Sequence, residues 1–172
     1  MKPVLGFFLI VLSTAPALAQ ADKNPVTSAV REILPRQQKN LVAAIEEMPA
    51  DKFSYKPTPQ QMSFAHLVMH IANSNNNLCA AIAESEPVKQ EQLKETDSKD
   101  KLVAALKASF EFCSSALAKV DDSKLGDKVE MHGHEGPRAA ALIALTNDWA
   151  DHYGAAAMYL RLNGLLPPTA KK

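Results

Sequence analysis

The sequence lacks an excess of charge of either sign, with 19 Lys and Arg residues against 19 Asp and Glu residues. This neutral balance argues against nucleic acid or an anionic membrane as the main partner. The chain also has no basic run interleaved with aromatic residues, so we expect no nucleic-acid-binding surface.

Several enzyme motifs are missing as well. The chain has no Gly-rich phosphate loop, no Ser elbow of a Ser-His-Asp hydrolase and no Cys-x-x-Cys pair. Strand alternation is confined to Phe53 and Tyr55, inside a Pro-rich loop. Hydrophobic residues nevertheless make up 47% of the 172 residues, which is enough for one domain with a real core.

Long apolar runs are scarce, and the one candidate starts the chain. After Lys2, the run Val4–Leu12 is too short to span a bilayer but suits a signal-peptide core, and Ala17–Ala19 is a small-x-small cleavage pattern. We predict a signal peptide over residues 1–19 and a mature chain over 20–172. The alternative is an uncleaved N-terminal anchor. Without the signal peptide the protein is expected to be periplasmic or secreted, with no membrane attachment.

Cysteine is rare too, since only Cys79 and Cys113 are present. In an oxidising compartment the two could form one disulfide. Two separate buried thiols are the alternative, and the Cα separation that would decide cannot be read from sequence.

Apolar residues recur at helical spacing in the predicted mature chain. They predict four helices, over residues 28–48, 63–82, 98–120 and 137–162, joined by loops that include 121–136. Pro35 lies inside the first helix and predicts a kink or a two-piece start there. Four amphipathic helices joined by loops predict an all-α four-helix bundle.

Two of these helices carry candidate metal ligands. His66 and His70 are four residues apart, and so are Asp148 and His152, which puts each pair on one helix face. If the helices face each other, the four side chains could surround one divalent ion. Imidazole with carboxylate suits Zn, Ni, Fe or Mn. The alternative for each residue is an ordinary hydrogen-bonded or surface side chain. A solvated loop is the favoured interpretation for a further pair, His132 and His134.

The C-terminal runs 148–154 (DWADHYG) and 159–164 (YLRLNG) resemble the closing signature of the DinB-like family. The segment 63–71, which contains His70, resembles the second-helix motif of that family. Residues 48–49 and 53–59 resemble its exported bacterial branch. The resemblance covers nearly all of the mature chain.

This resemblance implies an up-down-down-up bundle that binds a divalent metal through three histidines, one on the second helix and two on the last. His70 and His152 match two of these ligands, whereas Asp148 stands where the third histidine is expected. An Asp side chain is still an acceptable ligand. His66, one turn before His70, could supply the missing imidazole.

Two hypotheses follow. In the first, an exported bundle binds one metal ion and acts as a hydrolase or transferase on a small-molecule substrate that the sequence does not identify, with His66 as catalytic proton shuttle. Some members of the family are hydrolases, and others are thiol-dependent transferases or isomerases. In the second, the metal site has lapsed and the bundle is a non-enzymatic ligand-binding or assembly module. A homodimer through helix faces is compatible with either hypothesis.

Overall fold

A computed structural model describes residues 23–88, 92–131 and 133–171. The described chain contains four long helices. They are α1 (Pro25–Glu47), α2 (Phe64–Ala83), α3 (Lys99–Leu117) and α4 (Arg138–Leu162). Each bound lies within three residues of the predicted one, so the predicted helical bundle is confirmed. The predicted signal peptide and its cleavage after Ala19 lie outside the described residues.

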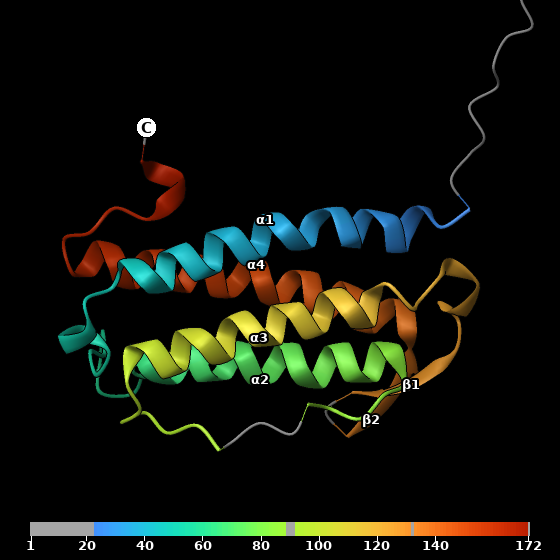
Figure 1. The fold of residues 1–172 in the computed structure, drawn as a ribbon, viewed down its shortest axis with the longest axis horizontal. Helices are drawn as coiled ribbons and strands as arrows, with labels where there is room; N and C mark the ends of the chain where they lie inside the picture. The colour runs from blue at the N-terminus through green and yellow to red at the C-terminus, as the bar shows by residue number, and fades with distance from the viewer. Residues whose placement is uncertain (1–22, 89–91, 132, 172) are drawn as a thin grey trace, which may run out of the picture.

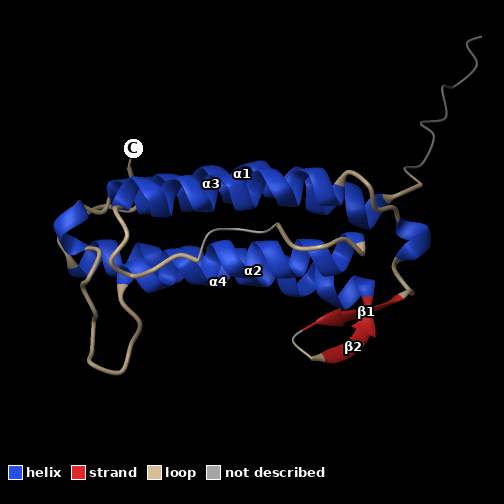
Figure 2. Cartoon of the chain, turned by 60° about the horizontal axis from the view of Figure 1, so that its bottom comes forward, coloured by secondary structure: helices blue, strands red, loops and turns tan. Residues whose placement is uncertain are grey.

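The helices form two layers, with α1 and α3 in one layer and α2 and α4 in the other (Figure 2). Each helix packs against its neighbour in the same layer and against one helix of the other layer, α1 against α4 and α2 against α3. Figure 1 shows that α1 and α4 run one way and α2 and α3 the opposite way, which is the expected up-down-down-up order. The described residues on either side of 89–91, in the connection between the parallel helices α2 and α3, lie alongside the bundle. No described helix is long and apolar enough to cross a membrane.

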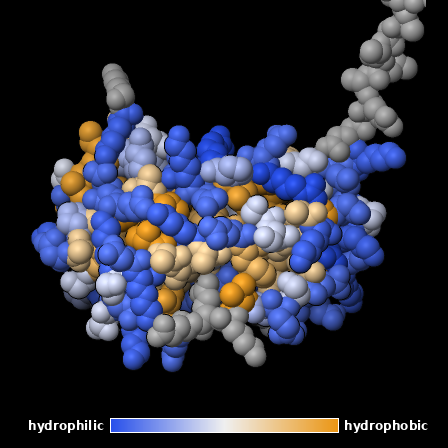
Figure 3. Space-filling model, viewed as in Figure 1, coloured by the Kyte–Doolittle hydropathy of each residue, from blue (hydrophilic) through white to orange (hydrophobic). Residues whose placement is uncertain are grey.

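Hydrophobic side chains fill the space between the layers. The largest fully buried ones include Trp149, Phe64, Phe110, Leu41 and Ile45, which come from all four helices. The face in Figure 3 carries mostly hydrophilic side chains, with hydrophobic ones visible along its middle. Burial of the apolar stripes is thus what holds the four helices together.

Helix α1 continues through Pro35, so of the two predicted alternatives the two-piece start is excluded, and a kink stays a prediction. Proline removes one backbone donor and leaves the carbonyl four residues earlier without its helical partner. Pro35 lies on the exposed side of α1, where water can satisfy backbone groups. The helix therefore tolerates this proline.

The prediction of a plain loop over 121–136 is also wrong. The short strands β1 (Lys128–Met131) and β2 (His134–Pro137) form an antiparallel hairpin. Gly133 adopts a φ of 79°, which is the left-handed backbone that a tight hairpin turn needs. Four-residue strands give too few alternations to recognise in sequence. His134 is exposed on this hairpin, and His132 lies outside the described residues.

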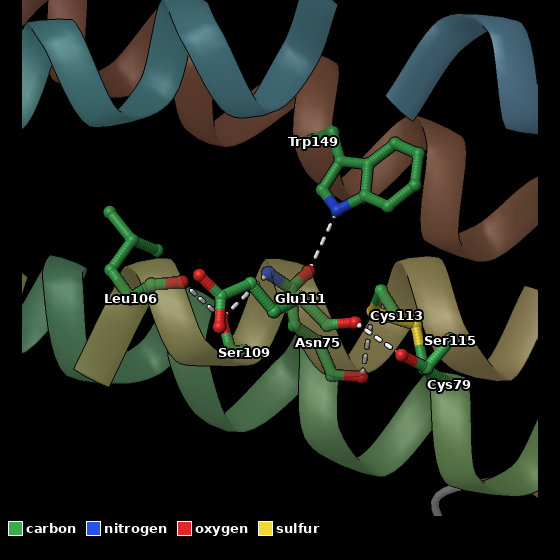
Figure 4. Close-up of a disulfide and its surroundings, with 8 residues drawn as sticks. All are labelled: Asn75, Cys79, Leu106, Ser109, Glu111, Cys113, Ser115 and Trp149. Carbon is green, nitrogen blue, oxygen red and sulfur yellow. Dashed lines mark hydrogen bonds between the residues drawn. A yellow bond between two sulfur atoms is a disulfide. The ribbon is translucent and has the colours of Figure 1, made fainter. Parts of the chain in front are cut away.

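A buried polar contact ties three helices together at mid-bundle. Asn75 on α2 is 0% exposed, accepts a hydrogen bond from Trp149 Nε1 on α4 at 2.7 Å, and donates to Ser109 Oγ on α3 at 2.9 Å. One turn further along, Cys79 and Cys113 form a disulfide with a Cα–Cα distance of 5.2 Å (Figure 4). Of the two alternatives for the cysteines, the structure has the disulfide.

Replacing Asn75 by Ala should lower the free energy of unfolding by about 2–4 kcal/mol, because the buried Trp149 N–H loses its partner and a cavity remains. Denaturant titration followed by fluorescence of Trp149, the single tryptophan, measures this loss. The matched control Asn73→Ala changes an exposed side chain of the same helix and should cost less than about 0.5 kcal/mol. Equal losses in the two variants would contradict a structural role for Asn75.

The connection after α2 is fastened to the beginning of that helix. Glu95 accepts a hydrogen bond from the Ser63 hydroxyl at 2.5 Å, and its other oxygen lies 2.9 Å from His66 Nδ1. Ser63 is at the same time the predicted N-cap, since its hydroxyl oxygen accepts from the His66 backbone N–H at 3.0 Å. The Ser63 hydroxyl and then His66 hold the pKa of Glu95 below its usual 4.5.

A folded-state pKa below the unfolded one means that Glu95 contributes stability that is complete above pH 4.5 and lost as the pH falls through the folded pKa. We therefore expect Glu95→Gln to lower the melting temperature at neutral pH, and this difference from wild type to vanish in acid. Thermal melts across pH check it. Glu86→Gln, on an exposed site of the same connection, is the control. A difference between Glu95→Gln and wild type that does not depend on pH would refute the assignment.

Candidate metal centre

Three of the four predicted ligands come together between α2 and α4. His70 lies on α2, and Asp148 and His152 lie on α4. One ligand atom from each residue can be chosen so that all three lie within 4.8 Å of one another. The imidazole rings of His70 and His152 have centroids 4.8 Å apart. The predicted convergence of the two helices on one point is thus confirmed for these three residues.

The local sequence explains how the side chains reach this point. Asp148 and His152 are one turn apart, so they occupy the same face of α4. Trp149 anchors that part of the helix to Asn75 of the antiparallel helix α2. Because the two helices are antiparallel, His70, which precedes Asn75 on α2, lies at the same level of the bundle as His152, which follows Trp149 on α4. The two imidazole rings meet there.

His152 is held in an orientation that suits a ligand. Its Nδ1 lies 2.6 Å from the backbone carbonyl of Asp148, so Nδ1 carries the proton and donates it to that oxygen. The same nitrogen lies 3.5 Å from Asp148 Oδ1. Hydrogen bonding at Nδ1 leaves Nε2 with the lone pair that a metal ion needs.

The three residues differ in solvent exposure. His152 is 9% exposed, Asp148 is half-buried and His70 is exposed. Metal–ligand bonds of about 2.0–2.2 Å need ligand atoms closer together than 4.8 Å. The value of 4.8 Å is the outer limit of these separations, so an ion would have to draw the three ligand atoms closer together. Two imidazoles and one carboxylate are a donor set that suits a divalent ion such as Zn or Fe, and the exposed His70 lies on the solvent side of the group.

His66 lies outside this group of three described residues. Its Nδ1 is engaged by Glu95, and its imidazole is exposed at the first turn of α2. Sequence spacing could not anticipate this, because Glu95 lies 29 positions further along the chain. The role of His66 as fourth ligand and proton shuttle stays a prediction.

A cavity of about 360 Å³ opens beside His152. Its lining comes from the loop before α2 and from both helices: Gln60, Gln61, Met62, Leu67, Asp151, His152, Ala155 and Tyr159. The Tyr159 hydroxyl donates to the Met62 carbonyl at 2.7 Å and so holds the loop against α4. Burial, with a contribution from Tyr55, raises the pKa of Tyr159, so the phenol stays a donor at neutral pH. The two glutamines carry no sequence pattern that marks a site, and sequence reasoning missed them.

Known proteins share this architecture. The model of the DinB superfamily matches residues 33–154, which include all three candidate ligands. A DinB-like protein from Bacillus subtilis has a similar structure, with a TM-score of 0.68 and 21% identity, over 84% of this chain and 99% of that chain. A DinB-like protein from Bacillus cereus has a TM-score of 0.67 and 15% identity, over 82% and 95% of the two chains.

A conserved protein from Enterococcus faecalis is also similar, with a TM-score of 0.62 and 20% identity, over 80% of this chain and 96% of that chain. No curated protein matches the chain in sequence. At these identities the solved structures establish the fold, and the family model covers well over half of the sequence. The chain therefore belongs to the DinB superfamily.

Proposed function

We propose that this protein binds one divalent metal ion through His70, Asp148 and His152 and uses it in a hydrolytic or transfer reaction on a small molecule. The observation that carries the proposal is the convergence of three ligand atoms, from two helices, within 4.8 Å. Three protein ligands leave further coordination positions for water or substrate, as in catalytic metal sites. When bound, such an ion acts as a Lewis acid and lowers the pKa of its water to about 7.

The chain's own residues support this chemistry in distinct ways. The Asp148 carbonyl fixes the His152 ring through Nδ1. Tyr159 holds the loop that lines one side of the neighbouring cavity, and the side-chain amides of Gln60 and Gln61 in that lining can hydrogen-bond a polar substrate. A cavity of about 360 Å³ is the size of a small-molecule pocket and is too small to enclose a protein or nucleic-acid substrate.

An exported location fits the same proposal. The disulfide between Cys79 and Cys113 is fully buried, and a stable disulfide is typical of oxidising compartments such as the periplasm. Together with the signal-like start of the sequence, it supports a periplasmic or secreted protein. A thiol-transferase reaction is less favoured there, because low-molecular-weight thiol cofactors are mainly cytoplasmic.

Elemental analysis of the purified, reconstituted protein should find one divalent ion per chain. We expect His70→Ala or His152→Ala to weaken metal binding more than about 100-fold, since even the loss of an outer-shell partner costs about 10–100-fold. Asp148→His should retain the ion more tightly if the ion is Zn or Ni, because imidazole suits these metals. Titration followed by the metal-dependent rise in melting temperature gives the affinities.

His66→Ala is the matched control, because it removes an imidazole one turn away on the same helix. It should leave metal binding unchanged if the three-residue group is the site. A wild-type protein that takes up no metal even after reconstitution would remove the enzymatic proposal and leave the non-enzymatic bundle. Loss of metal in His66→Ala would instead restore His66 as the fourth ligand.

A further inference from the structure

Another cavity, of about 400 Å³, lies between α2 and the connection that follows this helix. Four carboxamide side chains line it, those of Asn73, Asn76 and Asn77 on the helix and Gln92 on the connection. The rest of the described lining is apolar, with no charged side chain in it. This described lining shares no residue with the cavity beside His152 and includes none of the three candidate metal ligands. The cavity is therefore a separate candidate binding site.

The three asparagines lie on one face of α2 because of their spacing. Asn73 and Asn77 are four residues apart, and Asn76 is three residues after Asn73. A polar helix face normally meets solvent. Here residues of the connection lie on the other side of the cavity, and one of them, Leu93, also packs against the hydrophobic core. The row of amides is thus one wall of a cavity and not a flat surface.

Both ends of the connection are fastened to the bundle. At its beginning, Glu84 accepts a hydrogen bond from Arg138, whose side chain is buried at the start of α4. Toward its end, Glu95 contacts the Ser63 hydroxyl and His66 Nδ1 at the start of α2. The residues of the connection that line the cavity come between these two contacts in the chain. The wall opposite the asparagines therefore has a fixed point on either side.

Asn76 distinguishes this cavity from an ordinary surface depression. The residue is 5% exposed, and its Oδ1 has no hydrogen-bond partner within the part of the chain that the structure describes. Its neighbour Asn75 is also buried, but both ends of that amide are bonded, to Trp149 and to Ser109. A buried polar atom without a partner destabilises a fold. Packing of the bundle thus explains Asn75, whereas Asn76 needs a partner from outside the chain.

The lining sets the chemistry of such a partner. Each carboxamide has an oxygen that accepts and an NH2 group that donates, and a half-turn of the amide exchanges the two. A hydroxyl group likewise donates and accepts, so a molecule with several hydroxyls can bond several of the four amides at once. An ion would lose its water without meeting an opposite charge in this lining, which is costly. Met69, Val88 and Leu93 offer apolar contacts to the C–H groups of the same molecule.

We propose that this cavity binds an uncharged, polyhydroxylated small molecule such as a sugar, through the carboxamides of Asn73, Asn76, Asn77 and Gln92. A volume of about 400 Å³ is at the lower end of small-molecule pockets and suits a sugar of one or two rings. The site takes no part in the proposed metal-dependent reaction. Sugar binding and metal binding can therefore be tested separately on the same chain.

A magnetic resonance titration of the isotope-labelled chain tests the site directly, because the side-chain NH2 groups of asparagine and glutamine give signals of their own. The probes are glucose, N-acetylglucosamine and trehalose, with charged glucuronate and glucosamine for comparison. We expect a neutral sugar to shift the signals of Asn76 and Gln92 saturably, and the charged sugars to bind about tenfold or more weakly. No saturable shift with any of the three neutral sugars would overturn the proposal. Equally tight binding of the charged sugars would overturn it as well.

Asn76→Leu separates binding from folding, because it replaces an unpartnered amide with an apolar side chain of similar size. Sugar binding should weaken about tenfold or more, while the melting temperature stays equal or rises. Gln92→Ala changes an exposed side chain on the opposite wall and should weaken sugar binding whatever Asn76→Leu does to folding. Asn147→Ala removes an exposed asparagine on α4 and is the matched control, with sugar binding as in the wild type.

Unchanged sugar binding in both Asn76→Leu and Gln92→Ala would mean that the sugar binds elsewhere, and would overturn the proposal. Metal uptake is measured on the same variants and should equal that of the wild type. A chain that binds sugar but no metal would contradict the proposed metal site alone. A chain that binds metal but no sugar would contradict the carboxamide site alone.

Discussion

The hydrogen bond between the Trp149 indole and the Asn75 side chain sets how α2 lies against α4. Both residues are fully buried, and a buried polar group without its partner is costly. Sliding one helix along the other by a turn would break this bond and bury the unpaired groups. In an antiparallel pair, the register at one level sets the register at all others. The meeting of His70 with His152 therefore depends on a contact that contains neither residue.

The same asparagine also connects α2 to α3, through Ser109. The disulfide between Cys79 and Cys113 repeats this pairing one turn on, and each pair has the same separation of 34 positions in the chain. A hydrogen bond and a disulfide thus fix the same register between the parallel helices α2 and α3. A hydrophobic core alone is tolerant of small shifts, whereas directional and covalent bonds are not. The helix that carries His70 is therefore held on two sides.

Helix α4 serves different purposes on its different faces. Its inner face contributes Trp149 to the core, and the side toward α2 presents Asp148 and His152. Its outer face carries Gly154 and Met158, which are both exposed. Helix α4 therefore has apolar residues on its exposed side as well, among them Ile143 and Leu162. Such a helix cannot be assigned a single buried stripe, and only the observed exposure distinguishes its faces.

The sequence by itself determined the four helices, because the helical period of apolar residues is a local property of each segment. It also predicted that His70, Asp148 and His152 would come together, along with His66, which does not join the group, since spacing of four puts candidate ligands on one face of each helix. It did not determine the hairpin, whose strands are too short to show a period.

Only the tertiary structure decided between the disulfide and free thiols, and only the tertiary structure joined His66 to Glu95. These outcomes depend on distances between residues that are 34 and 29 positions apart in the chain. Such distances are set by how the helices pack and by the path of the connection between them. No pattern within a single segment contains that information.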